Sequence, residues 1–393
     1  MGFLCYDIKM KSLFKFLLTL ALLVFLFFWY IVKPFVPTEQ SLGMHYGANQ
    51  TTEFFDEAYK NVSAQKPGVK IASITVNHHL LAPHLIAKEF ALVATDQPIT
   101  VVLLSPNHFF RGQGGAITSQ YDWQTPYGVL KSNQVVIKQL SDSGLVNIDE
   151  TPFDQEHGAA NIVGFIKKSL PNATVVPLIV KENLSKEKID QLAEKLKDIL
   201  PADSLIVGSI DFSHYLPSNA ADFHDIQTLA VMNNFDYDRI DRLDIDSHPG
   251  LRLLLKYFDA TGNKKFVLTS HENSSTVTGN FNFVETTSYI NGYFTKGQNQ
   301  KDNHRTVLYI QGLNPQDRWK PDASDRLYKF NPEITTIKPH ELDFLNLDDK
   351  PLAVGLVYNP SLTDIYLFPL DTRNNLIQLL PQPEPDTMHI QIK

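Results

Sequence analysis

The stretch IASITVNHH at residues 71–79 joins an apolar, β-branched run to two adjacent histidines. Similar stretches are ITVVLLSPNH at 99–108, SLIVGSIDFSH at 204–214 and KFVLTSH at 265–271. Each predicts a buried β-strand that ends in polar, histidine-bearing sequence. Because residues just past the carboxyl ends of parallel strands gather along one edge of a sheet, where α/β proteins place ligands, we expect these histidines to converge on one site.

Helical patterns separate the predicted strands and decide the fold class. Apolar residues have helical spacing at 83–94, 158–170, 186–200, 219–232 and 249–260. Alternation of strands and helices is typical of α/β proteins. It predicts a mostly parallel sheet flanked by helices on both faces.

The rest of the chain is organised around this α/β domain, which we place at residues 69–296. Residues 34–68 are predicted to be a polar tether. Beyond a polar linker that begins at 297, short strand candidates lie among many Pro, Asn and Asp residues. Residues 297–393 are therefore predicted to be a linker and a small β-rich C-terminal region.

An uncharged apolar run, FLLTLALLVFLFFWYIV at 16–32, lies near the start of the chain. It is just long enough to span a hydrocarbon core as a helix. Three lysines precede it, one follows it closely, and Trp29 and Tyr30 lie at its far end. The pattern predicts a transmembrane anchor at 12–33, a cytoplasmic N-terminus at 1–11 and an extracytoplasmic body. A cleaved signal peptide is the alternative, although its apolar region is normally shorter.

The composition excludes some partners and ligands. A net charge of −8 and a pI near 5.9, without a basic run in the body of the chain, argue against nucleic-acid binding. The single cysteine, Cys5, precedes the predicted anchor. A metal bound by the body of the protein must therefore use histidine and carboxylate ligands.

His78 and His79 directly follow the first predicted strand and are candidate metal ligands. Adjacent side chains of an extended chain point in different directions, so we expect one of them to reach a given metal. His108 lies in a turn favoured by Pro106, and His271 follows a later strand; both are further ligand candidates. A capping or hydrogen-bonding role is the alternative for each of these histidines.

Two histidine–carboxylate pairs are candidates for acid–base chemistry. Asp211 could orient His214 or accept its proton, and a neutral histidine suits general-base catalysis or metal ligation. Glu156 and His157 precede a helical run and are candidates of the same kind. Helix capping and charge pairing at a helix start are the structural alternatives for both pairs.

The segment RGQGG at 111–115 is a further candidate, because Arg111 could contact an anionic substrate and glycine permits close backbone approach. A surface turn is the alternative. The histidine-rich, oxygen-supplemented set as a whole suits iron(II), zinc or copper better than calcium or magnesium. The chain has no GxSxG elbow, Walker loop or GxGxxG after a strand, so serine-hydrolase, P-loop and dinucleotide-binding functions gain little support.

Several of these motifs, taken in order, resemble one known family. The stretches TVNHHLLAPHLIAKEF, VVLLSPNHFFRGQGG, FDQEHGAANIVGF, IVGSIDFSHY and HENSSTVTGNFNFVETTSYINGYF resemble the Memo-like family, also called AmmeMemoRadiSam system protein B. The resemblance covers about residues 70–294. It implies a fold similar to that of class III extradiol dioxygenases, which are non-haem iron enzymes with an α/β core.

The resemblance also implies a metal-binding pocket. Its first two histidine ligands match His78 and His108, His214 lines the same pocket, and Glu156 and His157 lie nearby.

A cysteine is a further ligand in family members with a metal site, in the region before the final strand. This chain has Val277 there, or its neighbours Thr276 and Thr278. His271 lies a few residues earlier and could substitute, but it is not the matched position.

These features predict a membrane-anchored Memo-like metalloprotein that binds a divalent transition metal, iron ahead of zinc or copper. Redox, dioxygenase-like or hydrolytic chemistry on a small molecule or peptide is expected of such a site. The alternative is a non-catalytic peptide- or anion-binding adaptor or scaffold that uses the same pocket, since the resembling family includes a member described as a phosphopeptide-binding adaptor. The missing cysteine favours the alternative, and the retained histidines favour the metalloprotein.

Overall fold

The computed structural model of the protein describes residues 19–20, 42–63, 65–216, 218–280 and 285–299. It also describes strands at 309–312, 328–330, 354–359, 364–369 and 387–390.

Five parallel strands form the centre of the main sheet, in the order β6-β8-β3-β9-β2. They are β6 (Gly128–Ser132), β8 (Ala173–Val180), β3 (Ile99–Pro106), β9 (Leu205–Ser209) and β2 (Ile71–Val76). Strands β3, β8 and β9 are buried along almost their whole length, as expected of parallel strands covered on both faces. The predicted α/β fold, with a large central sheet flanked by helices, is confirmed.

Antiparallel strands extend both sides of this parallel centre, so the sheet is mixed. Strand β12 (Thr286–Thr295) is antiparallel to β2, and β11 (Asn263–Asn273) is antiparallel to β12. On the other side β5 (Asp122–Thr125) is antiparallel to β6, and β1 (Met44–Tyr46) is parallel to β5. The shorter strands are β4 (Ala116–Thr118), β7 (Asn147–Ile148), β10 (His214–Leu216) and β13 (Gly297–Gln298).

Helices cover both faces of the sheet. One apolar core joins it to α2 (Thr52–Tyr59), α3 (Pro83–Val93) and α6 (Val163–Ser169), and the other to α4 (Gln134–Asp142), α7 (Lys186–Ile199) and α9 (His248–Thr261). In β3, Val101 and Leu103 lie in the first core, while Val102 and Leu104 lie in the second. This alternation follows from the two-residue period of a strand.

The sequence of α7 shows how a covering helix forms. The Ser185 side chain caps its start by accepting a hydrogen bond from the Lys188 N–H. The helix then buries Ile189, Leu192, Ala193 and Leu196, whose spacing places them on one face.

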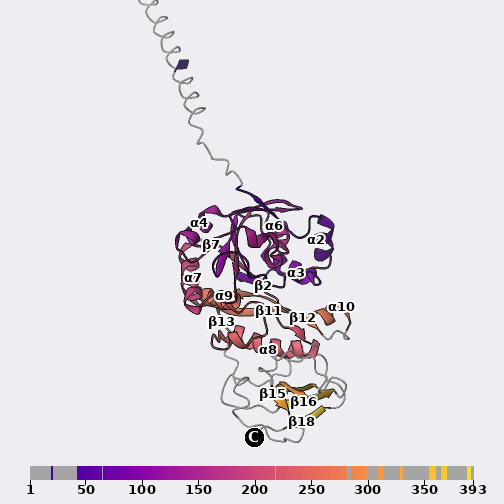
Figure 1. Ribbon diagram of the computed structural model, residues 1–393. Coiled ribbons are helices and arrows are strands. Elements are labelled where there is room, and N and C mark those ends of the chain that lie inside the picture. The colour runs from indigo at the N-terminus through magenta and orange to yellow at the C-terminus, as the bar shows by residue number, and fades with distance from the viewer. Residues whose placement is uncertain are drawn as a thin grey trace, which may run out of the picture. The chain divides into compact units, whose positions relative to one another are not determined.

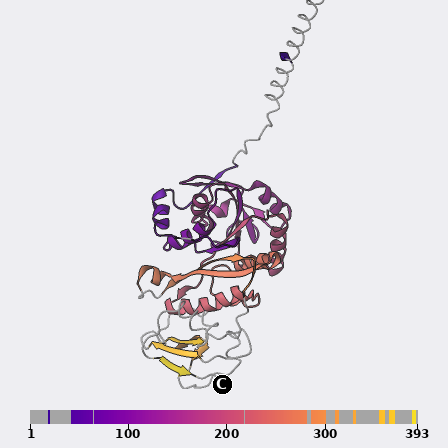
Figure 2. The same ribbon diagram turned by 180° about the vertical axis from the view of Figure 1, so that it is seen from behind.

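Four short helices complete the main body, and one long helix lies beside the last strands. The short helices are η1 (Thr151–Asp154), α5 (His157–Ala160), η2 (Ile240–Arg242) and α10 (Ser274–Thr278). The long helix, α8 (Ser218–Asn234), lies along β11 and β12 in Figure 1 and again in the reverse view of Figure 2.

The strand order places the ends of β2 and β3 on either side of the end of β9. Although β9 comes later in the chain than β2 and β3, it lies between them. The segments that follow β2 and β3 therefore leave the sheet on either side of β9. Such a switch in strand order is where α/β proteins bind ligands.

A separate five-stranded sheet lies within the region predicted to be β-rich. Its order is β15-β14-β17-β16-β18. The strands are β14 (Tyr309–Gly312), β15 (Tyr328–Phe330), β16 (Val354–Asn359), β17 (Asp364–Pro369) and β18 (Thr387–Ile390). The predicted domain division at residues 34, 69 and 297 stays a prediction.

One prediction about the start of the chain is corrected. The predicted anchor at 12–33 lies outside the described residues, apart from Thr19 and Leu20. Within the part of the chain that the structure describes, no helix has both the length and the apolar character needed to cross a membrane. The predicted single-pass membrane location, with a cytoplasmic N-terminus and an extracytoplasmic body, is therefore not supported.

Candidate metal centre

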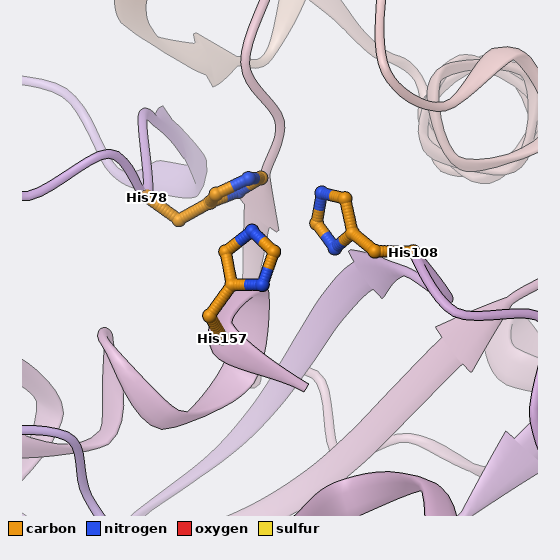
Figure 3. A group of neighbouring side chains, drawn as sticks. All are labelled: His78, His108 and His157. Carbon is orange, nitrogen blue, oxygen red and sulfur yellow. The ribbon is translucent and has the colours of Figure 1, made fainter. Parts of the chain in front are cut away.

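Three imidazole rings meet at the carboxyl end of the parallel strands, as Figure 3 shows. His78 follows β2, His108 follows β3, and His157 is the first residue of α5. The ring centroid of His78 lies 5.0 Å from that of His108 and 5.3 Å from that of His157, and the last two are 4.0 Å apart. One ring nitrogen of each lies within 4.8 Å of the others, so the group could hold a metal ion.

Asp246 lies between two of these rings, although the sequence did not single it out. Its Oδ2 atom is 3.3 Å from Nε2 of His78 and 3.7 Å from Nε2 of His108. The side chain is 7% exposed, and its Oδ1 atom has no hydrogen-bond partner among the described residues. A buried carboxylate oxygen without a donor is destabilising, and a cation beside it would offset that cost.

The ring of His78 is oriented by β9. Ser209 Oγ donates to the carbonyl of Gly158 at 2.7 Å, and it lies 3.1 Å from Nδ1 of His78. Because the serine proton is already used, Nδ1 is the donor in this pair, and Nε2 of the neutral ring carries the lone pair. Asp211 adds a second restraint, since its Oδ1 accepts from the His78 backbone N–H at 3.0 Å.

The ring of His108 is oriented in the same way by Glu156. The carboxylate accepts from His108 Nδ1 at 2.6 Å, from the His108 backbone N–H at 2.9 Å and from the Gly158 N–H at 2.9 Å. Nε2 is again the ring nitrogen that faces Asp246. Carboxylates that fix the tautomer and orientation of a histidine in this way are common beside metal-binding histidines.

Glycine is required at position 158 for this arrangement. A Cβ atom there would lie 2.1 Å from Oγ of Ser105 and 3.2 Å from Oε1 of Glu156. The start of α5 can therefore approach β3 closely only without a side chain at Gly158, and this approach brings Glu156 and His157 to the site.

Neighbouring charges shift the pKa values of two of these rings in opposite directions. Burial lowers the pKa of His108, but hydrogen bonds and charges of Asp246 and Glu156 raise it to about 10. A proton on Nε2 of His108 would thus stand where a metal would bind. Burial and the charges of His108 and His78 lower the pKa of His157 to about 4, so His157 is neutral at pH 7.

Asp211 and His214, predicted as acid–base residues, lie at the same site. The Asp211 backbone N–H donates to Oδ2 of Asp246 at 3.0 Å. Burial would raise the pKa of Asp246, but a hydrogen bond from His108 and the charges of two further histidines, His214 among them, lower it. His214 is part of β10, which pairs with β12. The catalytic roles predicted for Asp211, His214, Glu156 and His157 stay predictions.

Two other predicted ligands lie elsewhere. His79 is more exposed than His78, and its Nδ1 is 2.9 Å from the hydroxyl of Tyr289 on β12. His271, on β11, lies with Asp222 and Asp225 rather than with the three-histidine group. The predicted ligand roles of His79 and His271 are untested, but the structure does not bring these two residues into the three-histidine group.

Asp222, Asp225 and His271 form a second group between α8 and β11. Nε2 of His271 donates to Oδ2 of Asp225 at 2.7 Å, and Oδ1 of Asp225 accepts from Ser213 Oγ at 2.7 Å. Oδ1 of Asp222 accepts from Asn273 Nδ2 at 2.8 Å. Burial raises the pKa of Asp222 to about 7, whereas Asp225 and Asp222 outweigh burial and raise that of His271 to about 9.

The position compared with the family cysteine is also placed by the structure. Val277 packs against an apolar cluster of Ala82, Leu85 and Tyr289.

Asp246 is the side chain that lies between His78 and His108. The sequence signal for it was the acidic run DID at 244–246 just before the capped start of α9, a pattern that also occurs at many ordinary helix starts.

Comparison with known proteins assigns the chain to a family. The family model for Memo-like proteins matches residues 41–289. A MEMO1 family protein of Caldivirga maquilingensis is 25% identical over 211 residues, which are 51% of this chain and 73% of that protein. One of Methanothermobacter thermautotrophicus is 28% identical over 138 residues, covering 34% of this chain and 50% of the relative. The match to the family model spans more than half of the chain, and the protein belongs to the Memo-like family.

Proposed function

We propose that this Memo-like protein binds one divalent transition metal through His78, His108 and Asp246. The observation that carries the proposal is the approach of two Nε2 atoms to one carboxylate oxygen, at 3.3 and 3.7 Å. Because both rings use Nδ1 as a donor, the Nε2 atom of each ring faces the negative oxygen of Asp246. When both rings are neutral, their Nε2 lone pairs and this oxygen repel one another, and a metal ion among them would turn the repulsion into attraction.

Iron(II) is the metal that we favour. Two histidines and one carboxylate with open positions are the donor set of many non-haem iron(II) oxygenases, while imidazole also suits zinc and copper. Bound here, iron would supply redox chemistry with O₂, and zinc would supply Lewis-acid chemistry. The buried Glu156 and Asp211 would hold the two histidines in place, because Glu156 accepts from His108 Nδ1 and Asp211 accepts from the His78 backbone N–H.

The remaining histidines of the site are suited to proton transfer. Burial lowers the pKa of His157, so its ring is neutral at pH 7, and it lies 4.0 Å from the ring of His108. It is partly exposed and faces the same space as the two ligand rings (Figure 3). We assign to it the acceptance of a proton from a substrate, and we keep His214 as the second candidate for this role.

Elemental analysis of the purified full-length chain tests the proposal. We expect about one metal ion per chain, and less than about a tenth of that in a His78→Ala, His108→Ala double variant, because most of the donor set is lost. His84→Ala, which removes an exposed histidine of α3, is the matched control and should retain the metal. A metal-free wild-type chain with native circular dichroism, after incubation with iron(II), zinc and copper, would overturn the metal centre and favour the adaptor function.

A further inference from the structure

A turn with two phenylalanines and an arginine lies against the histidine site. The residues that leave β3 read NHFFR at 107–111. The ring centroid of Phe109 lies 6.0 Å from that of His157 and 6.4 Å from that of His108. Cζ of Arg111 lies over the same ring, 5.9 Å from the Phe109 centroid. One phenyl ring therefore lies beside both the imidazoles and a guanidinium group.

The turn is held in one arrangement by its own hydrogen bonds. Oδ1 of Asn107 accepts from the Arg111 backbone N–H at 3.1 Å, and Nδ2 of Asn107 donates to the Arg111 carbonyl at 2.8 Å. Between them Phe110 has φ of 54°, a conformation that a bulky side chain rarely adopts. Backbone strain of this kind concentrates at functional sites, where surrounding contacts maintain it.

Exposed apolar side chains gather on the segments that carry the site residues. Phe109 is 48% and Phe110 54% exposed, both after β3. Leu81, after β2, is 41% exposed, and Tyr215, after β9, is 57% exposed with φ of 58°. Single exposed apolar residues are ordinary, but these lie on three segments that carry site residues, and Phe109 lies directly beside two of the imidazole rings.

Arg111 supplies the charge complementarity. Within the described residues it forms no ion pair with a carboxylate, and its guanidinium group lies near the Phe109 ring. The acidic residues Glu156 and Asp211, in contrast, are buried and bonded to backbone N–H groups at the site. Arg111 therefore offers a cationic partner to a negatively charged ligand group, while the carboxylate of Asp149 lies further along the same segment, where its Oδ2 accepts from the Gln113 N–H at 3.1 Å.

We propose that the turn at 107–111 recognises a small organic acid with a flat apolar body. The flat body lies against Phe109, the carboxylate pairs with Arg111, and the opposite end of the molecule faces the three histidines. The assignment of a reacting end rests on the proposed metal centre, whereas recognition of the acid does not require metal.

Binding of a matched pair of fluorinated probes tests this recognition. The full-length protein, metal-free or loaded with zinc, is titrated against 3-fluorophenylacetate and against its neutral counterpart 3-fluorophenethyl alcohol, followed by ¹⁹F NMR. We expect Arg111→Gln to weaken binding of the acid by about tenfold or more and to leave the alcohol nearly unchanged, because a charge-assisted contact is lost. Phe109→Ala should weaken both probes. Lys138→Gln and Val135→Ala, exposed residues of α4, are the controls.

The outcomes separate this inference from the metal centre. Equal weakening of the acid and the alcohol by Arg111→Gln, or no binding of the acid to the wild type, would overturn the recognition. Acid binding that depends on Arg111 in a chain that takes up no metal would support the recognition while overturning the metal centre. Stoichiometric metal without acid binding would do the reverse.

Discussion

Two groups of histidine and aspartate side chains occur in the described part of the chain, and each could geometrically hold a metal. One comprises His78, His108 and His157, with Asp246 beside the first two. The other comprises Asp222, Asp225 and His271. In the second group the donors and acceptors pair internally, because His271 and Ser213 both donate to Asp225. In the first, Oδ1 of Asp246 has no donor among the described residues.

Proximity of ligand-type side chains does not by itself make a metal site. Below pH 7, where Asp222 is mostly protonated, the Asp225–His271 ion pair beside it leaves the group electrically neutral and hydrogen-bonded, so it needs no cation. Asp246, in contrast, has two Nε2 atoms facing its Oδ2 and keeps Oδ1 without a donor among the described residues. We therefore expect the first group to govern metal content and the second to govern stability.

Removal of the Asp225 carboxylate, at the centre of the second group, should lower the stability of the protein more than any other change considered below. Asp225→Ala leaves His271 and Ser213 without their buried partner, and breaking a buried ion pair in this way costs about 3–5 kcal/mol. Urea denaturation measures the change in the free energy of unfolding. Metal content, measured at a temperature where the variant is folded, should stay near the wild-type value. A decrease of less than about 1 kcal/mol in the free energy of unfolding would contradict the role given to this group.

The matched change in the first group is Asp246→Ala. Asp246 is a proposed ligand, and loss of a ligand should weaken metal binding more than loss of a residue that only orients one. We therefore expect the metal affinity to fall by at least about 100-fold. Titration with zinc against a chelator of known affinity measures the change. Asp222→Ala, which removes a buried aspartate from the other group, is the control, and equal effects of the two variants would break the distinction.

Glu156→Gln should have an intermediate effect on metal binding. The glutamine keeps the size of the side chain but not the charge that orients His108 Nδ1, so the metal affinity should fall about 10- to 100-fold. The same zinc titration measures it, with Glu187→Gln on the exposed side of α7 as the control. An unchanged affinity would mean that the backbone alone positions His108.

The smallest effect expected is on the pH dependence of stability, and it belongs to the second group. The pKa of Asp222 is raised by burial from 3.8 to about 7 in the folded chain. The folded state then binds more protons than the unfolded state between these values, so this group makes stability fall as pH rises through that window. A single proton sets the maximum slope at about 1.4 kcal/mol per pH unit.

Asp222→Asn removes this titrating proton. Its free energy of unfolding, measured by urea denaturation from pH 4 to pH 8, should fall less steeply with pH than that of the wild type. Parallel curves for the two proteins would show that Asp222 has the same pKa in the folded and unfolded chain.

The central part of the fold was predictable because it depends on local pattern. The buried runs at 71–76, 99–106 and 205–209 are long, β-branched and separated by helical spacing, so strand and helix were distinguishable. The order of the strands was not predictable, since it depends on contacts between segments far apart in the chain. The insertion of β12 between β2 and β11 is one example.

The same contrast between local pattern and long-range contacts applies to the residues of the site. His78 and His108 were predictable because both follow strands next to β9, and strand ends share an edge. His271 lies at the same edge but two strands from β2, which is about 10 Å at the usual strand spacing. Asp246 lies in an irregular segment before α9, where no periodicity shows which way a side chain points.

The oxygen and nitrogen donors of the first group have a consequence for how the protein tolerates oxidants. A thiolate ligand is lost when peroxide converts it to sulfenic or sulfinic acid, and its repair requires a reductant. Asp246, His78 and His108 contain no thiol, and the single cysteine of the chain is Cys5. Oxidation or chemical modification of thiols should therefore leave the metal capacity of this protein intact, so that metal supply and chelation, rather than thiol redox state, set how much of it is loaded.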